Sequence, residues 1–95
     1  MNAPVEARLN LIRMIVQRME RMSADSSWTH IASGCRGSIL KLLDRLDGFS
    51  DPETLPAEDI ASLDLLIDHG LDLLAKAARE IGDPELLNFA TQRRN

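Results

Sequence analysis

The sequence predicts an all-α fold, an up-down bundle of three main helices and a short C-terminal fourth helix, in a single domain over residues 1–95. Aliphatic side chains recur at the three- and four-residue spacing of a helix along three long segments. The chain contains two Phe, one Trp and no Tyr, and an aliphatic core with few β-branched residues favours helices over sheets. Prolines and glycines separate the segments, which is typical of helix boundaries.

The first helix is predicted from about Pro4 to Met22. Pro4 suits a first-turn position, because the N–H that proline lacks has no partner there in any helix. The apolar residues of this helix span an arc of about 160° at 100° per residue; they are Val5, Leu9, Leu11, Ile12, Ile15, Val16, Met19 and Met22. A polar break over residues 23–27 follows it.

The second helix is predicted to begin with Ser26 or Ser27 as its cap and to run to about Asp47, where Gly48 is a stop signal. Its core face is expected to contain Trp28, Ile31, Ala32, Cys35, Ile39, Leu42, Leu43 and Leu46.

Two glycines, Gly34 and Gly37, lie inside this second helix. Each costs about 1 kcal/mol of helix stability relative to alanine. Two interpretations are open: a kink or break between two shorter helices, or a place where another backbone comes close.

After a linker over residues 49–56, the third helix is predicted from about Ala57 to Ile81, ended by Gly82. Its apolar stripe again spans about 160°, and it contains Ile60, Leu63, Leu66, Ile67, Gly70, Leu71, Leu73, Leu74, Ala77, Ala78 and Ile81. The sequence Asp83-Pro84-Glu85 supplies a cap, a first-turn proline and an acid, which predicts a short fourth helix over about residues 84–91.

Three aspartates, Asp64, Asp68 and Asp72, follow one edge of this stripe at i,i+4 steps. Like charges at that spacing repel by a few tenths of a kcal/mol per pair. We therefore expect cations to offset them, with Lys76 one turn further along and the arginines of the first helix as partners.

The apolar stripes of the first and third helices are both wider than the roughly 100° that one contact requires. They predict a symmetric homodimer that buries the surplus apolar surface of these two helices. If the chain is monomeric, the fourth helix must cover that surface, and deleting residues 83–95 should expose an apolar patch. The residues expected at the dimer interface are Leu63, Leu66, Gly70, Leu73, Leu74, Ala77, Leu11, Ile15 and Met22, with Asp64, Asp68 and Asp72 at its edge.

The sequence offers little chemistry. Cys35, the single cysteine, excludes an intramolecular disulfide, and it lies about 140° from His30 on one helix, which argues against a thiol–imidazole dyad. The chain has neither a phosphate-binding glycine loop nor zinc-ligand spacing. It also lacks the Glu-x-x-His pairs of bundle metal sites. We predict that it is not an enzyme and needs no metal or cofactor.

A net charge of −4, with the four arginines of the first helix spread around it, disfavours nucleic-acid binding. No segment approaches the roughly 20 apolar residues that span a membrane, and the first residues do not resemble a signal peptide, so a cytoplasmic location is expected. The predicted function is a non-catalytic protein-interaction module: a small adaptor, regulator or assembly factor. The alternatives are a signalling domain with a phosphoacceptor at His30 or His69, and a bundle that binds a metal or small ligand.

Overall fold

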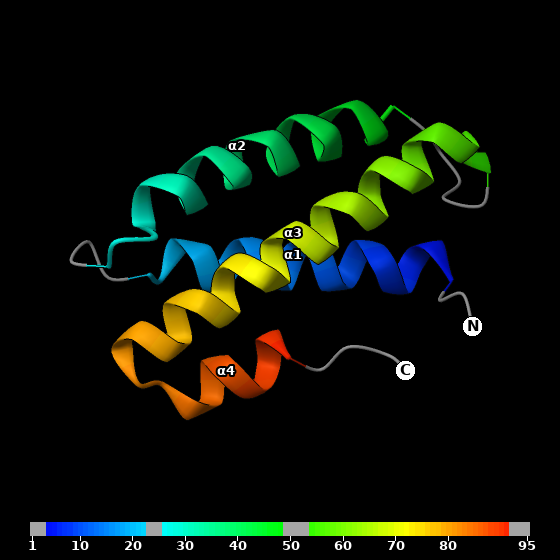
Figure 1. Ribbon diagram of the computed structural model, residues 1–95. Helices are drawn as coiled ribbons and strands as arrows, with labels where there is room; N and C mark the ends of the chain where they lie inside the picture. The colour runs from blue at the N-terminus through cyan, green and yellow to red at the C-terminus, as the bar shows by residue number, and fades with distance from the viewer. Residues whose placement is uncertain (1–3, 23–25, 49–53, 92–95) are drawn as a thin grey trace.

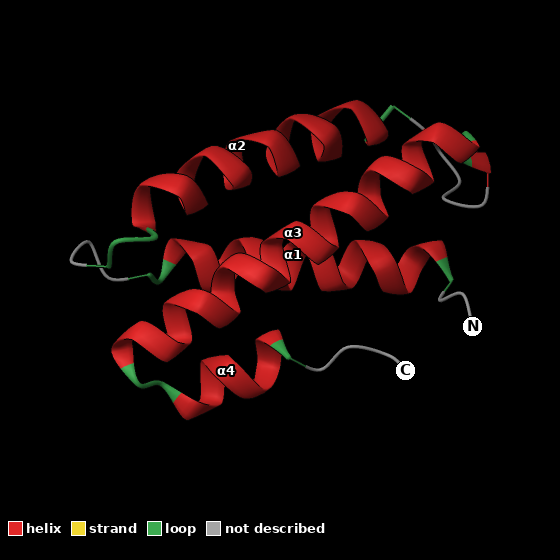
Figure 2. Cartoon of the chain, viewed as in Figure 1, coloured by secondary structure: helices red, strands yellow, loops and turns green. Residues whose placement is uncertain are grey.

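A computed structural model describes residues 4–22, 26–48 and 54–91, which contain four helices and no strand. The helices are α1 (Val5–Glu20), α2 (Thr29–Leu46), α3 (Ala57–Ile81) and α4 (Pro84–Ala90). Consecutive helices run in opposite directions, and α3 crosses α1 and contacts all three others (Figure 1). A short described loop joins α3 to α4 (Figure 2). The predicted all-α class and the four packed helices are confirmed.

The predicted helix ends agree with the structure to within two or three residues. Pro4 and Pro56 immediately precede α1 and α3 in extended conformations. Pro4 therefore lies one position before the first turn in which it was expected, whereas α3 begins at Ala57 as predicted. Gly82 ends α3 with φ 70° and ψ 40°, a left-handed conformation that a residue without a Cβ adopts at little cost. The Asp83 carboxylate then accepts the backbone N–H of Leu86 at 3.1 Å, which caps α4. The central part of the linker, residues 49–53, lies outside the described residues.

The predicted cap of α2 is wrong. The helix begins at Thr29, its N-cap position is Trp28, and no side chain caps it. The hydroxyl of Ser26 instead donates to a Glu80 carboxylate oxygen of α3 at 2.9 Å, and the hydroxyl of Ser27 binds the same carboxylate. The serines therefore attach the start of α2 to α3, a role that depends on a residue more than fifty positions away.

At the two internal glycines the predicted break is absent, and no other part of the described chain comes close. The helix α2 continues through Gly34 and Gly37 as one element. A Cβ built on either glycine meets no atom within 4 Å. The helix is held by the packing of its opposite face, where Ala32, Cys35 and Ile39 are buried.

The core lies where α1, α2 and α4 meet different sides of α3. Ile15, Leu63, Leu73, Leu74 and Ala77, all expected at a dimer interface, are at most 3% exposed inside this one chain. The helices α1 and α3 also lie close together at another expected interface residue, where a Cβ on Gly70 would lie 2.8 Å from Ile15 Cγ2 of α1. The remaining apolar members of that set, Leu11, Leu66 and Met22, are partly buried against the core.

Most of the residues expected at the dimer interface are therefore covered by neighbours in the same chain. The seven-residue helix α4 packs on α3 and buries Leu86, Phe89 and Ala90 there. In addition, the Arg18 guanidinium of α1 lies 4.6 Å from the centre of the Phe89 ring, a distance at which a cation and an aromatic face attract each other.

Two predicted core residues lie outside the core. Ile31, near the start of α2, and Ile81, the last residue of α3, are exposed. The axes of α2 and α3 diverge toward the start of α2 (Figure 1), which is the end of the helix where Ile31 lies. A helical wheel predicts the direction in which a side chain points, but it does not show whether a neighbouring helix lies close enough to cover that side chain.

Candidate docking groove between α2 and α3

A groove opens between α2 and α3 near the C-terminal end of α2. Five residues line it: Lys41, Leu42 and Arg45 from α2, and Ser62 and Leu66 from α3. Its volume is ≈ 390 Å³, at the lower end of the range of about 300–1,000 Å³ found for ligand pockets. We call this feature the docking groove.

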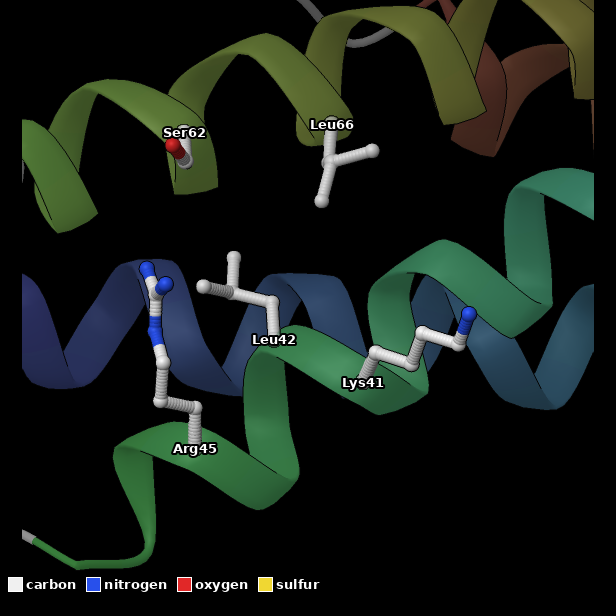
Figure 3. Close-up of a pocket in the computed structure, with 5 residues that line it drawn as sticks. All are labelled: Lys41, Leu42, Arg45, Ser62 and Leu66. Atoms are coloured by element: carbon white, nitrogen blue, oxygen red, sulfur yellow. The ribbon is translucent and has the colours of Figure 1, made fainter.

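The floor of the docking groove is apolar. Leu42 and Leu66 point toward each other across it from the two helices (Figure 3). Leu42 is buried, while Leu66 is only partly covered and packs against the edge of the core. Part of this aliphatic floor is therefore in contact with water in the free chain, and burial of such apolar surface is favourable.

The rim on the α2 side is basic. Lys41 and Arg45 are both exposed, and their i,i+4 spacing places them on the same face of the helix. Arg45 forms an ion pair with Asp59, a carboxylate buried in the first turn of α3, yet 62% of the Arg45 side chain remains exposed. Lys41 enters no ion pair among the described residues. The rim thus keeps an accessible positive charge beside the apolar floor.

An exposed leucine stands next to the groove on α3. Leu65 is 70% exposed, the highest value among the large apolar side chains that are exposed in the described part of the chain. At 100° per residue its side chain lies about 60° around α3 from that of Ser62, which lines the groove. Of the four residues three or seven positions away, Glu58, Asp68 and Asp72 are acidic and Ser62 is not.

The expected pairing of the acidic ladder with cations is confirmed at Asp64 and Asp72. Arg8 of α1 contacts Asp64 with a 2.8 Å N–O distance, and Lys76 contacts Asp72 at 3.0 Å. The Arg8 side chain is mostly buried between the helices, so its charge gains more from a partner than a fully solvated one would. The Arg8–Asp64 pair fixes α1 against α3 within one chain.

The residues considered for catalysis or phosphotransfer lie apart from one another. His30 and His69 are both exposed, on different helices. Cys35 is buried, and desolvation raises the pKa of its thiol, which reduces the thiolate fraction that would act as a nucleophile. In residues 4–22, 26–48 and 54–91, no group of three or more His, Cys, Asp or Glu side chains is arranged to hold a metal ion.

Sequence reasoning missed the groove and Leu65. A signal for Leu65 was present, because it is a leucine on the polar side of α3 among acidic residues, where the helical wheel offers it no core contact. Lys41 and Arg45 carried a weaker signal as an i,i+4 pair of cations. The groove itself depends on how far α2 and α3 separate, which no local pattern encodes.

The comparisons with known proteins give no information on function, so the functional proposal is based on this geometry. No helix in the described part of the chain is both long and apolar enough to cross a membrane. No known protein family, curated protein or solved structure matches the chain.

Proposed function

We propose that this chain is a non-catalytic protein-interaction module whose docking groove receives an apolar side chain from a helical partner. The observation that carries the proposal is the pairing of an apolar floor, Leu42 and Leu66, with a basic rim, Lys41 and Arg45. Such a groove recognises a helix through one or two aliphatic anchors and through the charges beside them.

The chemistry of the lining supports binding over catalysis. None of the five residues that line the groove is a His, Asp, Glu or Cys, and Ser62 supplies the one hydroxyl. A serine nucleophile needs an adjacent base to take its proton. The one carboxylate that contacts the lining, that of Asp59, is buried and paired with Arg45.

The partner that fits this groove presents an aliphatic side chain with acidic neighbours. An acid beside the anchor meets Lys41, whose charge is unpaired within the described chain. Complementary charge of this kind speeds encounter and fixes the orientation of the partner more than it adds affinity. The predicted homodimer is one form of this association, with contact residues other than those buried in the core.

Photo-crosslinking in the native host tests the proposal. A benzophenone amino acid placed at position 41 should give a defined protein adduct, whereas the same probe at Gln17, on the exposed side of α1, should not. A Ser62→Phe substitution that fills the groove should abolish the adduct while circular dichroism shows unchanged helix content. Equal adducts at positions 41 and 17, or no adduct at position 41, would show that the groove is not a docking site.

A further inference from the structure

We infer that the occupant of the docking groove is a second copy of this chain, with the Leu65 side chain of each copy inserted into the groove of the other. This inference rests on the proposed function, because it names the partner of the same groove. It keeps the predicted homodimer but assigns the contact to exposed residues. The residues that the sequence analysis expected at the interface lie mostly in the core.

One chain carries both halves of the contact side by side. Leu65 is 70% exposed and follows Ser62 by three positions on α3, while Ser62 and Leu66 form the α3 wall of the groove. In a two-fold interface the same surface serves both copies, so an apolar side chain and a neighbouring apolar groove exchange places across the axis. An axis that passes between Leu65 and the groove satisfies both contacts at once.

The charges on the two halves are complementary. The surface around Leu65 carries more acid than base, with Glu58, Asp68 and Asp72 one or two turns away on the same face of α3 and with Lys76 paired with Asp72. The groove presents Lys41 and Arg45. Insertion of one Leu65 therefore brings the acidic face of its helix toward the basic rim of the other copy, and the second contact repeats this by symmetry.

The overall charge favours this arrangement over unspecific association. The chain carries −4, so two copies repel each other in most orientations. The orientation that places the acidic face of α3 against Lys41 removes part of that repulsion. The contact is small, with one aliphatic anchor from each copy, and small interfaces are weak. We expect a dimer that forms at about 10–500 µM chain concentration.

Sedimentation equilibrium of the full chain tests this inference. Wild type should associate to a dimer, and Leu65→Ser should weaken association by about 100-fold, because two-fold symmetry removes two buried leucines. Met14→Ser is the matched control, since Met14 is exposed on α1 and should leave association unchanged. Lys41→Glu should weaken the dimer, and raising the salt concentration should weaken it too.

A disulfide experiment tests the same contact directly. Mixing Leu65→Cys chains with Lys41→Cys chains under mild oxidation should give more crosslinked heterodimer than either variant gives alone, while Leu65→Cys mixed with Gln17→Cys should not. A wild-type monomer up to about 500 µM would overturn the inference, as would equal loss of association in Leu65→Ser and Met14→Ser.

The two proposals can be rejected independently of each other. A monomeric chain that still gives an adduct of another protein at position 41 leaves the docking groove in place and rejects the second copy. No adduct at position 41 together with a monomeric chain rejects both.

Discussion

Replacing Gly70 by alanine should destabilise the bundle, whereas the same replacement at Gly34 should stabilise it. Both residues lie inside long helices, and both lack a side chain. A Cβ on Gly70 would lie 2.8 Å from Ile15 Cγ2 and 3.4 Å from Met19 Cε. A Cβ on Gly34 would meet nothing within 4 Å. The two substitutions therefore differ in packing and share the same change in backbone freedom.

The magnitude follows from two opposing effects. Alanine is favoured over glycine in a helix by about 1 kcal/mol, which should appear in full at Gly34. At Gly70 the added methyl presses on Ile15, a fully buried residue whose branched Cβ leaves its γ-methyl little freedom to turn. Overpacking of this kind costs about 1–3 kcal/mol. The net change at Gly70 is then a loss of up to about 2 kcal/mol, and the difference between the variants equals the packing cost.

Urea denaturation followed by circular dichroism measures these changes for Gly70→Ala, Gly34→Ala and wild type. In thermal unfolding each kcal/mol should correspond to about 4–8 °C for a chain of this size. The double variant Ile15→Leu with Gly70→Ala supplies the control, because leucine removes the γ-methyl from Cβ. The cost of Gly70→Ala should fall by at least about 0.5 kcal/mol in that background.

Equal stability of Gly70→Ala and Gly34→Ala would refute the reasoning, because it would mean that α1 and α3 are not in close contact at Gly70. An unchanged cost in the Ile15→Leu background would refute the assignment of the clash to Ile15.

Three further predictions concern contacts between helices. Arg45→Ala should destabilise the fold by about 1–3 kcal/mol, because the buried Asp59 carboxylate loses its partner; urea denaturation that shows less than about 0.5 kcal/mol would mean that water replaces the arginine. Hydrogen bonds from Ser27 and then Ser26 lower the pKa of Glu80 below its ordinary value of 4.5. That contribution is present above pH 4.5 and is lost as the pH falls through the lowered pKa, so Glu80→Gln should flatten the decline of Tm on acidification, and an unchanged slope would contradict it. Truncation after Gly82 removes α4 and uncovers apolar surface on α3, so the shortened chain should bind the dye ANS more strongly than the full chain; equal binding would show that α4 covers little.

The parts of the fold that follow from local physics could be predicted from the sequence. The apolar spacing of α1 and α3 located both helices, and Pro56, Gly82 and Asp83 marked boundaries that the structure confirms. These residues act within one or two turns, through a missing N–H, a left-handed backbone or a side-chain cap. Nothing distant has to be known for such effects, which explains why the predicted ends were close.

The errors arose where a residue distant in the sequence determines the local structure. Ser26 and Ser27 have the composition of a helix cap, but the Glu80 carboxylate offers them a charged acceptor, and hydrogen bonds to ionised groups are about twice as strong as neutral ones. The two glycines of α2 cost about 2 kcal/mol together, yet burial of several large apolar side chains on the other face outweighs that cost. The acceptor is not visible in the local sequence, and the sequence shows which face of α2 is apolar without showing how fully its neighbours bury that face.

The broad apolar stripe of α3 shows how far the width of a stripe can predict the neighbours of a helix. A stripe of about 160° states that a helix has more than one neighbour, and it gives no information on whether the extra neighbour belongs to the same chain. Here α4, a helix of seven residues, supplies the third neighbour, and Gly70 permits the close approach of the first. Evidence for a contact between chains has to come from an apolar side chain that the stripe leaves out. Leu65 is the residue on which we propose such a contact, because it lies outside the stripe of α3, 70% exposed, beside a groove with a basic rim.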